Sequence, residues 1–214
     1  DMNITDILTG TIKLNSHMSK EEVQKLASCP NIAIDITDCE NEWLDEVLPE
    51  TVKAKIKFYS KKPLILKNVK HVGDIWANNA KKLDLPALQT AGNIGAKNAK
   101  SVDLPALTTV VNIRAEDAEK VDLSALQTAG CIWTYDAEKL DLSALQNAGY
   151  IWASSAKKLD LPALQTAGDI YAYSATWVKI NQNASYKYLH APKWKRPEPA
   201  HTKPTFFQKL RMRF

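Results

Sequence analysis

The chain has 214 residues, of which 45% are hydrophobic and 24% are charged, so it is long enough to bury a core and has the composition of an ordinary soluble protein. Its formal charge of +4 is uneven, because residues 176–214 carry nine Lys or Arg against a single acidic residue, Glu198. No run of about 18 uninterrupted apolar residues is present, which excludes a continuous membrane-spanning segment.

The residues that most often bind metals or form disulfides are scattered. They are His17, His71, His190, His201, Cys29, Cys39 and Cys131. Their spacing lacks the close pairing of a zinc site or a disulfide framework, so we expect reduced thiols, no metal and no cofactor. The first residues lack the basic start and apolar run of a secretory signal, which favours a cytoplasmic location. A secreted protein trimmed of its signal would begin in the same way.

Residues 1–62 are predicted to form N-terminal α/β capping units. Ile12, Ile34 and Ile56 recur at intervals of 22 residues, and Ile75 follows after 19. Between the first two lies a helical pattern, in which Ser19 stands before the amphipathic segment 20–26 as an N-cap.

Residues 63–181 are predicted to hold six repeats of 19 residues and a final half coil. The string Leu-Asp-Leu-Pro-Ala-Leu at Leu83 returns, with small changes, at Val102, Val121, Leu140 and Leu159, and a divergent copy begins at Leu64.

One column of each repeat is always isoleucine, and alanine follows two residues later in every repeat except one, which has Thr134. The isoleucines are Ile75, Ile94, Ile113, Ile132, Ile151 and Ile170. In the run from Ile151 to Ala153, inward and outward positions alternate, which predicts a strand with one buried face. A glycine column precedes it, where we expect a corner with a positive φ or a close approach of backbones.

A unit of 19 residues has no room for a long crossover helix and two strands. Successive coils must therefore wind through short strands and corners around a narrow core. The sequence predicts a mostly β fold, a right-handed parallel β-solenoid, with short helices only in the N-terminal units.

The strings Leu-Asp-Leu-Pro-Ala-Leu-Gln-Thr-Ala-Gly and Ile-Trp-Ala resemble the leucine-rich-repeat class, most closely its short bacterial and receptor-L-type repeats. The resemblance covers Ile12 to Ile180, with alanine in the column where the family commonly has asparagine. It implies recognition of a partner through the strand face, and names no particular partner.

The outward columns vary between coils whose buried columns hardly change, so we expect them to carry function. The predicted partner-binding residues are Trp76, Arg114, Trp133, Tyr135, Tyr150, Trp152, Tyr171 and Tyr173. Their aromatic rings make a larger patch than a soluble monomer usually exposes. Two alternatives are that the C-terminal tail covers the patch and that the rings only stabilise the sheet by stacking.

A column of aspartates is predicted to form a solvated charge face rather than a catalytic carboxylate pair or calcium sites. It contains Asp84, Asp103, Asp122, Asp141 and Asp160, with Lys82, Lys120, Lys139 and Lys158 two residues earlier in four of these coils. Repeated identical environments do not give the unlike pKa values that an acid and base pair needs. We find no catalytic constellation and expect no enzyme.

Residues 182–214 are predicted to form a basic C-terminal cap and tail, with the repeat register ending near Asn181. Tyr186, Tyr188, Leu189 and Trp194 are the candidates for covering the open end of the solenoid. The predicted tail-docking residues are Phe206, Phe207, Lys209, Arg211, Arg213 and Phe214.

The sequence therefore predicts a non-enzymatic repeat scaffold that binds a protein partner through its aromatic strand face and its basic tail. The alternative is a nucleic-acid or anionic-surface binder driven by the tail. Carbohydrate binding by the aromatic face is a third interpretation, which applies if the protein is secreted.

Overall fold

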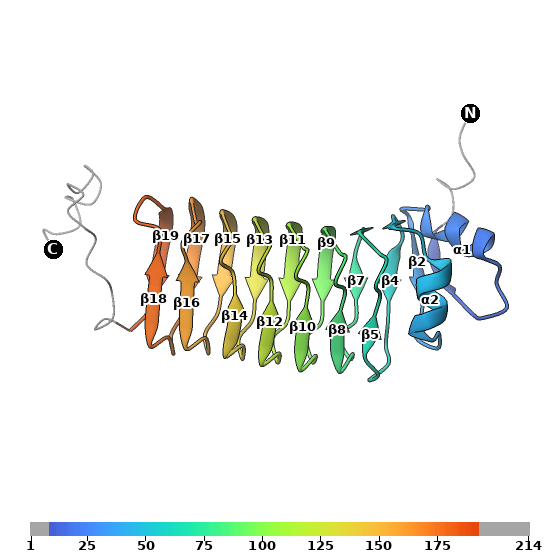
Figure 1. The fold of residues 1–214 in the computed structure, drawn as a ribbon, viewed down its shortest axis with the longest axis horizontal. Coiled ribbons are helices and arrows are strands. Elements are labelled where there is room, and N and C mark those ends of the chain that lie inside the picture. The colour runs from blue at the N-terminus through green and yellow to red at the C-terminus, as the bar shows by residue number, and fades with distance from the viewer. Residues whose placement is uncertain (1–8, 193–214) are drawn as a thin grey trace, which may run out of the picture.

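The computed structural model describes residues 9–192, which form one elongated solenoid (Figure 1). Each turn adds one strand to a long sheet, in which neighbouring strands pair in parallel. The strands of the long sheet, in spatial order, are β1 (Gly10–Lys13), β2 (Ile32–Asp35), β4 (Lys55–Lys57), β7 (Ile75–Trp76), β9 (Thr90–Gly95), β11 (Thr109–Arg114), β13 (Thr128–Trp133), β15 (Asn147–Trp152), β17 (Thr166–Tyr171) and β19 (Ser185–His190). Short strands β3 (Thr51–Val52) and β6 (His71–Val72) join its margin. The predicted parallel β-solenoid is confirmed.

A second wall of parallel strands closes the core on the opposite side. It consists of β5 (Leu64–Ile65), β8 (Lys82–Asp84), β10 (Ser101–Asp103), β12 (Lys120–Asp122) and β14 (Lys139–Asp141), followed by the pair β16 (Lys158–Leu161) and β18 (Trp177–Ile180). Tight turns join the two walls, so each 19-residue coil is a flattened ring of two strands and two corners.

Helices α1 (Lys20–Ala27) and α2 (Asn41–Val47) take the place of the second-wall strand in the first two turns, at the N-terminal end of the rod (Figure 1). The N-cap prediction is confirmed: the backbone N–H of Glu22 donates to Ser19 Oγ at 3.2 Å, and the N–H of Ser19 donates to Glu22 Oε2 at 2.8 Å. This reciprocal capping box satisfies two helix-end donors, which fixes where α1 begins.

The isoleucine column forms the centre of the core. Register pairs run without interruption from Ile12 through Ile34 and Ile56 to Ile170. From Ile34 to Ile170 every member is at most 1% exposed. Buried Leu or Val from the second wall, such as Leu83 and Val102, fills the space in front of them. Parallel stacking therefore places like residue on like residue, and one buried column specifies the register of the whole rod.

The expectation that the 19-residue register ends near Asn181 is wrong. Strand β19 pairs with β17 in the same register, so that Leu189 lies beside Ile170 and His190 beside Tyr171. Tyr186 occupies the column that holds Ala167 in β17, and it is 41% exposed. Tyr186, Tyr188 and Leu189 thus belong to the last strand instead of folding over it, and Trp194 lies outside the described residues.

The glycine column is explained by close backbone approach and not by a positive φ. Of the described residues only Gly10 has a positive φ, of 111°. A Cβ built on Gly92 would lie 2.1 Å from the carbonyl oxygen of Gly73, and one on Gly168 would lie 2.1 Å from that of Gly149. Side chains are excluded there because consecutive coils press their backbones together.

A short ladder of polar side chains follows the glycine column, and the sequence analysis did not predict it. Asp74 Oδ1 accepts from the backbone N–H of Asn93 at 2.7 Å and from its Nδ2 at 3.0 Å. Asn112 continues the ladder by donating to Asn93 Oδ1 at 2.9 Å and accepting from the N–H of Cys131 at 3.0 Å. These side chains satisfy backbone donors beside the glycine positions, where the strand register skips a residue.

We predict that Ile151→Ala lowers the free energy of unfolding by about 2–5 kcal/mol, because it removes buried methylenes from a column that cannot collapse locally. Urea unfolding followed by circular dichroism measures the loss. Ile12→Ala is the matched control, since Ile12 on the first strand is only half-buried, and its loss of stability should be clearly smaller. Equal losses would mean that burial does not set the stability of the column.

Candidate binding surface

The outward face of the long sheet carries the residues predicted to bind a partner. Strand register places the residues that follow the isoleucines, or Leu189 in the last strand, in one line. This line contains Trp76, Gly95, Arg114, Trp133, Trp152, Tyr171 and His190. Because the strands are parallel and in register, each side chain in this line lies beside its neighbour at the strand spacing of about 4.8 Å.

The last four strands bring eight rings together into what we call the aromatic strip. Its members are Trp133, Tyr135, Tyr150, Trp152, Tyr171, Tyr173, Tyr188 and His190. Trp152 is at the centre, with ring centroids 5.8 Å from Trp133 and 5.2 Å from Tyr171. At the C-terminal end, Tyr171 and His190 stack with centroids 4.5 Å apart and planes 3° apart.

Six members of the strip were predicted, and the structure adds Tyr188 and His190. Their only signal in the sequence is the 19-residue interval that separates Asp169 from Tyr188 and Tyr171 from His190. The surrounding residues of β19 lack the repeat's Ala-Gly and isoleucine, so the interval does not stand out.

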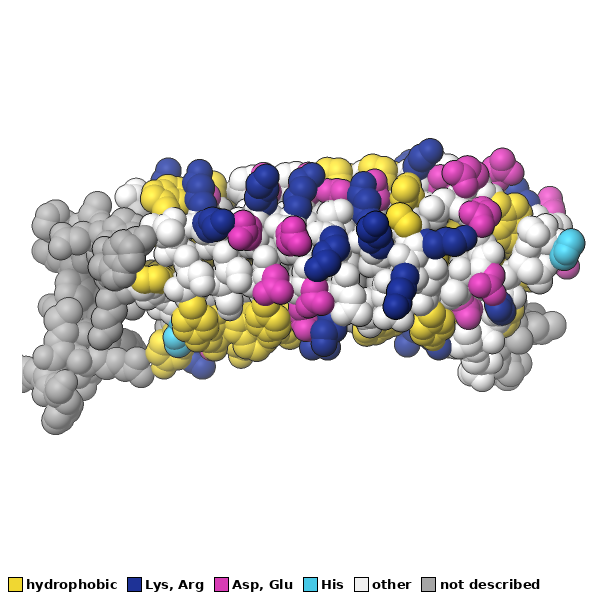
Figure 2. Space-filling view, turned by 90° about the horizontal axis from the view of Figure 1, so that it is seen from below, with side chains coloured by type: hydrophobic (Ala, Val, Ile, Leu, Met, Phe, Trp, Pro, Cys, Tyr) yellow, Lys and Arg dark blue, Asp and Glu magenta, His cyan; other side chains and the backbone are white. Residues whose placement is uncertain are grey.

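The strip is exposed at its margins and half-buried along its middle. Tyr150 and Tyr173 are 43% and 58% exposed, whereas Trp133, Trp152 and Tyr171 shield one another. Figure 2 shows hydrophobic side chains gathered in a band along one edge of the C-terminal half of the rod. The rings at the centre of the strip therefore pack against one another, and its outer rings are available for contact.

Charged side chains lie next to the aromatic strip at its N-terminal end. The Arg114 guanidinium lies over the Trp133 ring, 5.2 Å from its centroid, and its Nε is 3.2 Å from Glu116 Oε1. Lys97 Nζ approaches Glu116 Oε2 at 3.6 Å. Arg114, predicted as a contact residue, thus joins the strip through a cation–π contact while its charge is balanced on the other side.

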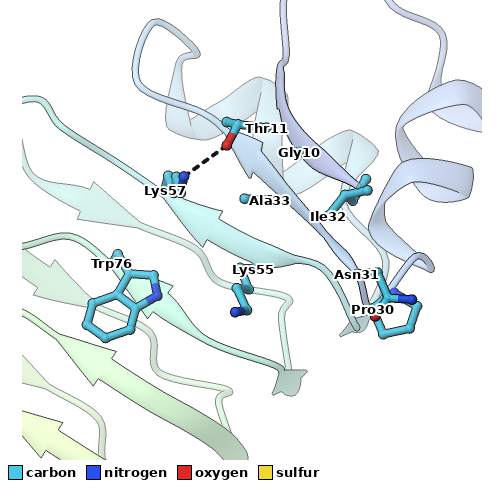
Figure 3. Close-up of a pocket in the computed structure, with 9 residues that line it drawn as sticks. All are labelled: Gly10, Thr11, Pro30, Asn31, Ile32, Ala33, Lys55, Lys57 and Trp76. Atoms are coloured by element: carbon cyan, nitrogen blue, oxygen red, sulfur yellow. Dashed lines mark hydrogen bonds between the residues drawn. The ribbon is translucent and has the colours of Figure 1, made fainter. Parts of the chain in front are cut away.

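Trp76 lies apart from the strip because Gly95 intervenes, and its indole packs where a side chain on Gly95 would be. It forms one wall of a shallow depression of about 450 Å³ near the N-terminal end (Figure 3). The depression is lined by Gly10, Thr11, Pro30, Asn31, Ile32, Ala33, Lys55, Lys57 and Trp76. Lys57 Nζ donates to Thr11 Oγ1 at 2.9 Å across its rim.

The aspartate column lies on the second wall and is partly compensated as predicted. Lys82 Nζ is 2.7 Å from Asp84 Oδ2 and 3.3 Å from Asp103 Oδ2, and Lys120 Nζ is 3.3 Å from Asp103 Oδ1. Lys158 instead lies over the Trp177 ring, 4.7 Å from its centroid. The charged face thus ends in a cation–π contact at the last coil.

Metal-ligating and nucleophilic side chains do not gather within residues 9–192, where no group of three His, Cys, Asp or Glu is arranged to hold an ion. Burial, followed by the charges of Asp38 and Asp35, raises the pKa of the Cys39 thiol to about 11. Burial likewise raises the pKa of Cys131. Both groups are protonated thiols at neutral pH, which makes them poor nucleophiles.

The tail-docking prediction concerns Phe206, Phe207, Lys209, Arg211, Arg213 and Phe214, all of which lie outside the described residues. In the described part of the chain, no helix is long and apolar enough to span a membrane.

We predict that Trp152→Ala lowers the free energy of unfolding by about 2–4 kcal/mol, because the indole contacts four rings at centroid distances of 5.2–6.3 Å. Thermal unfolding by differential scanning calorimetry measures the change. Trp76→Ala serves as the matched control, since Trp76 packs against a glycine, and its loss should be about half as large or less. A larger loss for Trp76→Ala would contradict a stabilising role of the ring stack.

We also predict that Cys39 reacts slowly with a thiol-specific disulfide reagent at pH 8, because its raised pKa leaves little thiolate. The same shift implies that folding stability supported by this group is complete below the ordinary thiol pKa and is lost as the pH rises toward about 11. Stopped-flow absorbance of Cys29→Ser, Cys131→Ser protein isolates this thiol. A rate at pH 8 equal to that of free cysteine would contradict the shift.

Comparison with protein-family models, with curated proteins and with solved structures finds no match to this chain. The parallel β-solenoid is therefore established by the strand pairing of the structure alone. Leucine-rich-repeat membership stays a prediction from the repeat pattern.

Proposed function

We propose that this chain is a non-enzymatic repeat scaffold that binds a protein partner through the aromatic strip. The observation that carries the proposal is a contiguous set of eight aromatic rings on one face of a regular sheet, with Tyr150 and Tyr173 turned largely to solvent. Contiguous exposed aromatic surface is uncommon on a monomer and is typical of interfaces.

The chemical composition of the strip supports this function. Trp, Tyr and Arg are the residues that most often carry binding energy at protein interfaces, and here Arg114 stacks directly on Trp133. The sheet beneath them is continuously paired from strand to strand, and the central rings pack against one another. Binding of a partner would therefore cost this chain little conformational entropy.

Stacking for stability explains only part of the strip. It accounts for the half-buried Trp133, Trp152 and Tyr171, whose faces cover one another. It does not account for Tyr173, which is 58% exposed, or for the concentration of rings in the last coils when earlier coils carry Asn78, Gly95 and Lys97 at equivalent positions.

The same geometry favours a protein over a nucleic acid or a carbohydrate. Bases and sugars stack on open ring faces, whereas the central rings here already pack against one another, with centroids 5.2–5.9 Å apart. The nucleic-acid alternative depends on the basic C-terminal segment, most of which lies outside the described residues. A cytoplasmic location and a partner contact by the tail remain predictions.

We predict that Tyr150→Ser combined with Tyr173→Ser reduces partner binding by at least about tenfold, with little change in melting temperature, because both rings are exposed. Proteins from the native cell that are retained on immobilised wild-type chain are identified by mass spectrometry, and the candidate is purified and titrated by calorimetry.

Tyr59→Ser is the matched control, because Tyr59 is 53% exposed and lies on the N-terminal half of the rod, outside the strip. The control should bind as the wild type does. A purified partner that binds the double variant and the wild type equally would refute the strip as the interface, and retention of nucleic acid that is lost at high salt would favour the alternative.

A further inference from the structure

Asp169 lies inside the aromatic strip, in the column that directly precedes the isoleucines. Its register partner in β19 is Tyr188, and Tyr150 holds the equivalent position in β15. Tyr171, two residues further along β17, donates its hydroxyl to Asp169 Oδ2 at 3.3 Å. One carboxylate is therefore bordered by three tyrosines.

The second oxygen of this carboxylate has no partner. Asp169 Oδ1 is buried and accepts no hydrogen bond within the described structure. Asp74, in the same column near the other end of the rod, uses its Oδ1 to accept two hydrogen bonds from Asn93. A buried acceptor without a hydrogen bond is destabilising, and Asp169 differs in this respect from Asp74 in the same column.

The ring of Tyr150 packs close to the strand that carries Asp169. Tyr150 leans over β17, since a Cβ built on Gly168 would lie 3.8 Å from Tyr150 Cε1. Loss of solvent contact, followed by the Asp169 charge, raises the pKa of Tyr171, which keeps its hydroxyl protonated as a donor. The surroundings are thus electron-rich ring surfaces and one negative charge.

No described basic side chain neutralises that charge. Lys187, the nearest in sequence on β19, places its Nζ over the Tyr188 ring at 5.5 Å from the centroid, and no ion pair joins it to Asp169. Arg114 is three coils away and is balanced by Glu116 at 3.2 Å. Within residues 9–192, the strip therefore carries a carboxylate without an ion-pair partner at its C-terminal end.

We propose that Asp169, with Tyr150, Tyr171 and Tyr188, forms a pocket for a guanidinium or ammonium group carried by a basic side chain of the protein partner. The inference rests on the proposed function and adds the chemistry of the contact. A cation there is attracted by the neighbouring aromatic rings and donates a charge-assisted hydrogen bond to the carboxylate. A planar guanidinium suits the site best, because it stacks on rings and donates in the same plane.

The test uses the full chain with N-acetyl-arginine methylamide as the probe and N-acetyl-citrulline methylamide as its neutral, nearly isosteric counterpart. Carbon-13 NMR of the tyrosine side chains follows each titration at constant ionic strength. We expect saturable shifts of the Tyr150 and Tyr171 signals with the arginine probe and none with citrulline.

Asp169→Asn, which keeps the shape and removes the charge, should weaken the arginine probe by about tenfold, the size expected for a charge-assisted contact. Asp160→Asn is the matched control, because Asp160 also has a buried Oδ1 without a partner but lies on the second wall, in β16. It should leave the titration unchanged. Unfolding measurements should show that neither variant loses stability.

Three results would overturn the proposal. Equal shifts with arginine and citrulline, or unchanged affinity in Asp169→Asn, would show that the strip has no cation pocket. A response that emerges only after Lys187→Gln, or after Lys193, Lys195 and Arg196 are all changed to Gln, would show that a cation of this chain occupies the pocket. In each case the Tyr150→Ser, Tyr173→Ser experiment remains an independent test of the strip as an interface.

Discussion

The inward register of one isoleucine per coil is the constraint on which the rest of the structure depends. In a strand, moving the pairing by one residue would turn every buried side chain outward, so a continuous buried column leaves only one register. The observed pairs from Ile34 to Ile170 satisfy this requirement at every coil. Once that column is fixed, the residues before and after it face solvent, and their alignment along the rod follows without further interactions.

Much of the fold could be predicted because the same pattern of buried and exposed residues recurs in every repeat. Burial of the isoleucine column and the parallel stacking follow from the 19-residue period. The cap at Ser19 follows from a local motif that needs no tertiary context. The last strand was missed because Tyr186 and Leu189 replace the expected alanine and isoleucine, although packing on β17 suffices to hold that strand in register. In this strand, tertiary packing sets the register, which the local sequence pattern does not indicate.

The sequence predicts which residues of the candidate site align along the rod, but not where the site begins and ends. Alignment of Trp133, Trp152 and Tyr171 follows from register, so the sequence placed them on one line. Which rings then touch depends on side-chain rotamers and on gaps such as Gly95, which isolates Trp76. The polar ladder from Asp74 and the unpaired oxygen of Asp169 were also invisible in the sequence, because hydrogen-bond satisfaction depends on the distance between neighbouring coils.

The tight contact between glycine backbones has a consequence for how such a rod can change over time. Gly149 packs on Gly130 as Gly168 packs on Gly149, so each coil presents nearly the same packing surface to the next coil. If one whole coil were duplicated or deleted, the two coils that become neighbours would still have matching packing surfaces. The length of the rod, and with it the width of the surface that it displays, can therefore be altered in unit steps without redesigning the interior.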